Sequence, residues 1–208
     1  RSVSAFLLNR SSDLESYCSD APAARFDNLS RNDDIIRGRI SVYSAKEAIS
    51  VVDKIISYED NPPVDSEFYN NALAVSLFYP NDYLKNYEDK GQDFFSEVEG
   101  INIDLKTLGY NVERKYNTQK EAIPQYYANG VKLSEELFTE ELGGNDFWDK
   151  DSTYLTDLVN KGKVFVVYNG HGNETGYSQT YSAKEVENMK NGNKTPVFFN
   201  FTCSTGTF

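Results

Sequence analysis

The chain has 208 residues, of which 39% are hydrophobic and 25% charged, so it is large and apolar enough for one globular domain with its own core. A net charge of −11 opposes nucleic-acid binding through phosphates, which needs a basic surface. No apolar run approaches the roughly 18 residues of a membrane span. Two cysteines, Cys18 and Cys203, are too few for a disulfide framework.

The amino-terminal part of the chain is predicted to contain one strand and one helix. Residues 3–8 are apolar enough for a strand, and a polar loop follows them. Ser44 and Glu47 form a capping box, in which the hydroxyl and the carboxylate satisfy opposite backbone amides at the start of a helix. Apolar residues then recur at helical spacing over 45–56, and Asn61 with the two prolines after it ends the helix.

The rest of the chain alternates between strand and helix patterns. We predict strands over 72–78, 110–116, 164–168 and 196–201, and helices over 94–108, 152–160 and 182–190. This alternation implies an α/β fold with a mostly parallel sheet and helices on both faces. Right-handed crossovers place the carboxyl ends of such strands along one edge. The acidic stretch over about 117–151 interrupts the alternation and is predicted to be an insertion.

Two reactive side chains follow two of the predicted strands. The single histidine of the chain, His171, comes shortly after the strand over 164–168, and Cys203 comes shortly after the strand over 196–201. In an open α/β sheet, ligands bind at the edge where strands end. A cysteine and a histidine that meet there can form a thiolate–imidazolium nucleophile.

The residue types also suggest how such a site would work. His171 would accept the thiol proton of Cys203 and later protonate a leaving amine, and the amides of Gly172 and Cys203 would stabilise an oxyanion. A histidine in a turn is also common on surfaces, and a cysteine in an apolar strand is commonly buried in a core. The residues alone leave both interpretations open.

Two segments resemble a known family. The segment 168–175 around His171 and the segment 201–208 around Cys203 resemble the catalytic segments of the gingipain-type cysteine peptidases. The stretch 34–59 resembles the junction between subdomains of that family. The resemblance implies a caspase-like fold and a fragment of a larger catalytic domain.

The resemblance also implies a domain organisation. Residues 1–60 would be the end of the preceding subdomain and the junction helix, and residues 61–208 a catalytic subdomain that is incomplete at its carboxyl end. A second chain that carries the remainder of the polypeptide would then be a partner. The location implied is secreted or on the cell surface of a bacterium.

The chemistry that the resemblance implies is peptide-bond hydrolysis through a Cys203 thioester, with His171 as base and with no cofactor and no metal. The substrate would be a peptide or protein, cut after a basic residue. Asp82 is the nearest substitute for the acid that orients the histidine in the family, and Asp93 falls near the acid of the substrate pocket. Either carboxylate could instead cap a turn or a helix.

Two other functions fit the same resemblance. One is a sortase-like transpeptidase that processes proteins in an outer-membrane secretion machine. The other is a catalytically silent interaction domain, suggested because Tyr79 stands where the family has its orienting acid.

Overall fold

The computed structural model describes residues 40, 42–78, 94–118, 131–132, 152–177 and 180–205. The chain divides into two compact units, residues 1–48 and 49–208. The strand expected over 3–8, most of the expected insertion, Asp82 and Asp93 all lie outside the described residues.

Helix α1 (Ala45–Asp60) begins and ends where the sequence predicts. The Glu47 amide donates to the Ser44 hydroxyl at 3.2 Å, and the Glu47 carboxylate accepts from the amide of Tyr43 at 2.7 Å. The carboxylate thus reaches one residue further back than the capping box predicted. The apolar stripe that predicted the helix is exposed, and no α1 side chain is buried. The exposed stripe consists of Ile49, Val52, Ile55 and Ile56.

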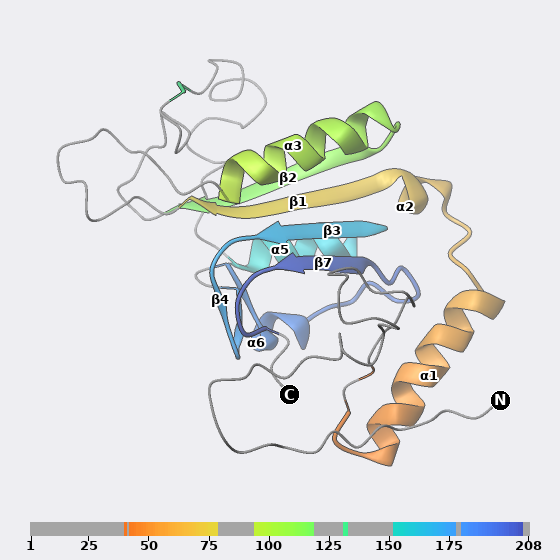
Figure 1. Cartoon of the computed structure of the whole chain (residues 1–208). Coiled ribbons are helices and arrows are strands. Elements are labelled where there is room, and N and C mark those ends of the chain that lie inside the picture. The colour runs from red at the N-terminus through yellow and green to blue at the C-terminus, as the bar shows by residue number, and fades with distance from the viewer. Residues whose placement is uncertain are drawn as a thin grey trace, which may run out of the picture. The chain divides into compact units, whose positions relative to one another are not determined.

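Four parallel strands form the main sheet, in the order β2-β1-β3-β7 (Figure 1). They are β1 (Asn71–Phe78), β2 (Asn111–Thr118), β3 (Phe165–Asn169) and β7 (Val197–Phe201). After β2 the chain crosses over to the other side of β1, so the strand order reverses between β1 and β3. Such a reversal is the switch point at which open α/β sheets form their binding crevice.

Helices lie on both faces of this sheet, as the alternation predicts. On one face α5 (Ser152–Asn160) packs Leu155 and Leu158 against Leu73 and Val75 of β1. Successive residues of a strand point to opposite faces of a sheet, so the alternate residues of the strands face α3. On the other face Tyr116 of β2 meets Phe95 of α3 (Phe94–Thr107), with ring centroids 4.7 Å apart.

Helix α3 ends at Thr107 in a glycine cap. The Gly109 amide donates to the Lys106 carbonyl, and the Tyr110 amide donates to the Leu105 carbonyl, both at 3.0 Å. Gly109 has φ +93°, the left-handed conformation that this cap requires and that glycine adopts without cost. The short helix α2 (Ser66–Asn70), capped by Asp65, leads directly into β1.

A second, small antiparallel sheet, which the sequence did not predict, follows β3. It consists of β4 (Gly172–Asn173), β5 (Gly176–Tyr177) and β6 (Tyr181–Ser182), in the order β4-β5-β6. It leads into helix α6 (Ala183–Val186), which is shorter than the helix predicted over 182–190. After α6 the amides of Asn188 and Met189 donate to carbonyls three residues back. This is the tighter 3₁₀ pattern, so the α-helix does not continue to Lys190. Asn160 at the end of α5 then accepts the Lys190 amide at 2.6 Å.

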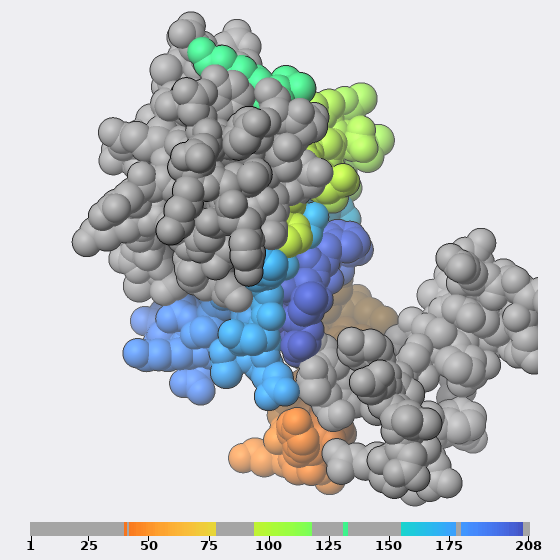
Figure 2. Space-filling model, turned by 60° about the vertical axis from the view of Figure 1, so that its left-hand side comes forward, coloured from red at the N-terminus to blue at the C-terminus, as the bar shows by residue number. Residues whose placement is uncertain are grey.

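Strand β7 forms one edge of the described sheet. On the face that carries α3, three of its large side chains are half exposed: Val197 at 52%, Phe199 at 44% and Phe201 at 55%. Part of this strand is visible at the surface in Figure 2, in dark blue.

Candidate active site

The His171 and Cys203 turns leave adjacent strands at the same level. Asn169 of β3 pairs with Phe201 of β7, and each reactive residue comes two positions after its member of that pair. The Gly170 amide donates to the Phe201 carbonyl at 3.3 Å and so extends the pairing into the turns. On the other side of β3, the Ser76 hydroxyl of β1 donates to the Asn169 carbonyl at 2.9 Å. Both turns therefore start from a fixed register.

The two turns are in direct contact at Gly172. A β-carbon added there would lie 2.9 Å from the carbonyl oxygen of Cys203 and 2.3 Å from the hydroxyl oxygen of Thr202. A backbone oxygen cannot move aside by a change of rotamer, so only glycine allows this approach. The glycine after His171 is therefore needed for the two reactive segments to meet.

His171 itself is partly buried and is held from two sides. Its ring meets Phe94, the first residue of α3, edge-to-face with centroids 4.9 Å apart and planes at 77°. Its carbonyl oxygen accepts a hydrogen bond from the Tyr168 hydroxyl at 2.6 Å. The sequence showed Phe94 only as a helix residue and Tyr168 only as a strand residue, so neither contact was predicted.

Cys203 is exposed, and its thiol forms no disulfide. Ser204 directly after it has φ +58°, a left-handed conformation that is uncommon for a residue other than glycine. Backbone strain of this kind persists where the surroundings enforce it and clusters at functional turns. The thiol thus projects from a constrained, solvent-accessible turn, where a nucleophile could meet a substrate.

A pair of tyrosines lies beneath the turns. Tyr168 of β3 and Tyr177 of β5 stack with centroids 3.7 Å apart and planes at 8°. Tyr177 donates a hydrogen bond to the side-chain oxygen of Asn200, on β7. Burial is the main cause that raises the pKa of both phenols above 10.0, so both hydroxyls remain protonated donors.

The structure thus brings together the turns that carry His171, Gly172 and Cys203. Asp82 and Asp93 lie outside the described residues. Within the described part, no three His, Cys, Asp or Glu side chains are grouped as metal ligands would be. None of the described helices has the length and apolarity needed to cross a membrane.

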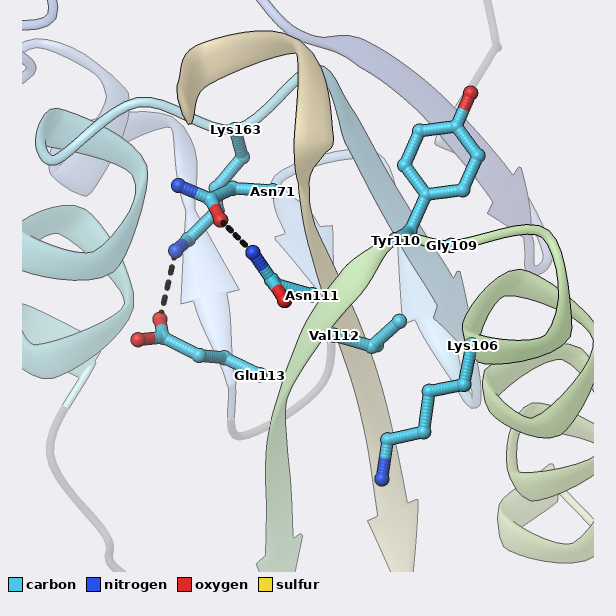
Figure 3. Close-up of a pocket in the computed structure, with 8 residues that line it drawn as sticks. All are labelled: Asn71, Lys106, Gly109, Tyr110, Asn111, Val112, Glu113 and Lys163. Atoms are coloured by element: carbon cyan, nitrogen blue, oxygen red, sulfur yellow. Dashed lines mark hydrogen bonds and ion pairs between the residues drawn. The ribbon is translucent and has the colours of Figure 1, made fainter. Parts of the chain in front are cut away.

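A separate cavity of about 510 Å³ lies at the other end of the strands, away from the His171 and Cys203 turns (Figure 3). It is lined by Asn71, Lys106, Gly109, Tyr110, Asn111, Val112, Glu113 and Lys163. Several of its polar groups satisfy one another. Lys163 and Glu113 form an ion pair at 2.8 Å. The side-chain amide of Asn111 donates to the side-chain oxygen of Asn71 at 3.4 Å. This cavity is at the amino ends of β1 and β2 and takes no part in the candidate active site.

Known proteins share this fold. The crystal structure of the Arg-specific cysteine proteinase gingipain R (RgpB) is similar, with a TM-score of 0.64 and 19% identity; the match covers 90% of this chain and 36% of that one. The complex of the pro- and mature domains of RgpB from Porphyromonas gingivalis is also similar, with a TM-score of 0.62 and 18% identity, covering 89% of this chain and 36% of that one. At these identities the structures show the fold alone. No curated protein matches the chain.

The sequence match is broader than the structural one. The model of peptidase family C25 matches residues 3–208, which is nearly the whole chain. This confirms the resemblance to the gingipain-type cysteine peptidases and the caspase-like fold that it implied. The chain spans about a third of the length of the similar structures, 36% in each case. We conclude that the chain belongs to peptidase family C25.

Proposed function

We propose that the chain carries the catalytic dyad of a cysteine endopeptidase, with Cys203 as nucleophile and His171 as general base. The observation that carries this proposal is the shared register of the two turns. Both leave β3 and β7 directly after the pair Asn169–Phe201, and they touch at Gly172. Membership of a cysteine peptidase family supports the same assignment.

The proposed reaction begins when the His171 imidazole accepts the proton of the Cys203 thiol. The thiolate attacks the carbonyl carbon of the scissile peptide bond, and the amides of Gly172 and Cys203 stabilise the oxyanion. The C–N bond breaks, the imidazolium protonates the leaving amine, and a thioester remains on Cys203. Water then attacks the thioester, His171 accepts its proton, and the thiol and a carboxylic acid are released.

The proposed substrate is a peptide or protein cut after a basic residue. The net charge of −11 is compatible with a cationic substrate. In this proposal Asp93 contacts the basic side chain and Asp82 orients the imidazole. Residues 61–208 form the catalytic subdomain, residues 1–60 precede it, and the protein acts outside the cell or on its surface.

A covalent label tests this function. A peptidyl chloromethyl ketone that ends in Arg or Lys should alkylate Cys203 and spare Cys18, as located by mass spectrometry of the digested protein. His171→Ala should abolish the selectivity while the fold, measured by circular dichroism, is kept. A matched label that ends in Glu should react slowly. Equal labelling of both cysteines in folded protein would exclude the endopeptidase.

A transpeptidase is the second candidate, favoured by the exposure of Cys203. An open thiol turn lets an amine compete with water for the thioester. Product analysis with an added amine nucleophile separates the two functions, since a transpeptidase joins the amine to the acyl fragment and a hydrolase releases mostly acid.

A further inference from the structure

We propose that Tyr168 and Tyr177 are positioning residues that hold the His171 turn and the Cys203 strand end in a fixed relation. This inference rests on the proposed function, because it assigns a role toward the same dyad. Its basis is a continuous path of contacts: from the His171 carbonyl to Tyr168, from Tyr168 to Tyr177, and from Tyr177 to Asn200 on β7.

The first contact, from Tyr168 to the His171 carbonyl, holds the His171 turn on the side that faces the sheet core. Tyr168 is fully buried, and its hydroxyl donates to the His171 carbonyl at 2.6 Å. A β-carbon at Gly170 would lie 2.5 Å from that same hydroxyl oxygen and 2.8 Å from the ring carbon that bears it. The phenol therefore fills the space under Gly170 and His171. The turn cannot sink toward the sheet, and it cannot rotate without losing the hydrogen bond.

The second contact joins this phenol to the strand that leads to the thiol. Tyr177 lies flat on Tyr168, and its hydroxyl donates to Asn200, three residues before Cys203. Tyr177 is itself placed by the small sheet. A β-carbon at Gly176 would lie 2.3 Å from the Tyr181 carbonyl oxygen, so β5 approaches β6 as closely as a glycine allows. The close pairing of β5 with β6 therefore fixes the position of Tyr177, whose ring stacks on Tyr168.

The link does not depend on the ionisation that the dyad undergoes. Both hydroxyls keep their protons well above the pH range in which a thiol and an imidazole titrate. The same donors are present whether His171 is neutral or charged. A change in the Cys203 pH profile after a tyrosine substitution would thus report geometry rather than titration of the tyrosine.

The test uses alkylation of Cys203 by iodoacetamide as a function of pH, with the modified cysteine located by mass spectrometry. Tyr168→Phe and Tyr177→Phe keep the stacked rings and remove only the hydroxyls. Each should slow alkylation of Cys203 near neutral pH about 3- to 10-fold relative to the unsubstituted protein. Asn200→Ala removes the exposed acceptor from β7 and should act like Tyr177→Phe.

The matched control is Tyr181→Phe. Tyr181 belongs to the same aromatic group, with its ring 6.2 Å from that of Tyr177, but its hydroxyl lies near Thr156 of α5. This substitution should leave the Cys203 profile unchanged within about twofold. Tyr168→Phe combined with His171→Ala completes a double-mutant cycle. Because Tyr168 acts through His171, its substitution should have no further effect in the His171→Ala protein.

The outcomes separate the two proposals. If His171→Ala slows alkylation while Tyr168→Phe, Tyr177→Phe and Asn200→Ala leave it unchanged in folded protein, the positioning role is overturned and the dyad stands. An equal effect of Tyr168→Phe with and without His171 also overturns it. If His171→Ala itself changes neither the rate nor the profile, there is no dyad and both proposals fall.

Discussion

The two edges of the same parallel sheet differ in what their polar groups do. At the amino edge, where the strands begin, Lys163 is almost fully buried and pairs with Glu113. The side chains of Asn71 and Asn111 form a hydrogen bond there. At the carboxyl edge, Cys203 is exposed and His171 is partly so, and the turns that carry them are fixed through backbone contacts. The cavity lined by Asn71, Lys106 and Lys163 lies at the first edge, and the candidate reactive groups lie at the second.

This contrast separates the two edges by the surroundings of their polar side chains. Side chains at the amino edge neutralise one another and hold strand starts together. At the carboxyl edge, the pairing ends and the chain turns sharply, so side chains are available to a ligand. Substitutions at the two edges should therefore affect different measurements.

The largest expected effect is from the dyad. Cys203→Ala and His171→Ala should each lower kcat/KM for a fluorogenic Arg or Lys peptide by at least about 10⁴-fold, because nucleophile and base act as a unit. The melting temperature of Cys203→Ala should stay within a few degrees, since Cys203 is exposed. A substrate that is still hydrolysed at the wild-type rate would place the chemistry elsewhere.

Gly172→Ala should have the next largest effect. The new β-carbon would meet the Cys203 carbonyl at 2.9 Å, so the two turns must separate, and displacements near 1 Å cost about 10²-fold in rate. The measurement is labelling of Cys203 by the Arg-directed reagent. Gly100→Ala is the matched control, because nothing lies within 4 Å of its added carbon on the exposed side of α3. It should keep full labelling and stabilise α3 by about 0.5–1 kcal/mol.

At the amino edge we expect a change in stability without a change in reactivity. Glu113→Gln leaves the charge of Lys163 without its carboxylate, and the Lys163 side chain is only 4% exposed. The free energy of unfolding should fall by about 1–3 kcal/mol, as measured in urea. Lys163→Met removes the charge as well and should cost less. Cys203 labelling that dropped in either variant would contradict the separation of the edges.

The smallest effect concerns the pH dependence of a second ion pair near the amino edge. Lys194 bonds to Asp65 at 2.6 Å and, together with the Glu67 amide, holds the Asp65 pKa below its ordinary 3.8. A carboxylate whose pKa is lower in the folded than in the unfolded chain stabilises the fold at pH values above its unfolded-state pKa. That contribution is lost as the pH falls through the folded-state pKa. Lys194→Met should therefore be slightly less stable than wild type at pH 7, and the difference should vanish well below pH 3.8.

The sequence predicted the elements with strong local signals. Strands β1, β3 and β7 appear within a residue of their expected bounds, and Gly109 ends α3 as predicted. The pairing of the His171 and Cys203 strand ends was also predicted, because both strands are parallel and consecutive in the main sheet. These features depend on hydrophobic period and on glycine, which a single sequence displays directly.

Other features depend on contacts that the local pattern does not display. Each strand of the small sheet has two residues, which is too short for any period, so β4, β5 and β6 were missed. The stack of Tyr168 on Tyr177 is a consequence of that sheet and was missed with it. The segment after α6 is held by a contact distant in the chain, because Asn160, thirty residues earlier, accepts the Lys190 amide.

The half-exposed edge strand β7 has a practical consequence for anyone who handles this polypeptide. Among the described strands β7 is at the end of the sheet, and its side chains Val197, Phe199 and Phe201 offer apolar area to another molecule, which favours edge-to-edge aggregation. The net charge of −11 opposes such self-association by repulsion. Because salt screens that repulsion, concentrated samples should remain clear in dilute buffer and become turbid as ionic strength rises.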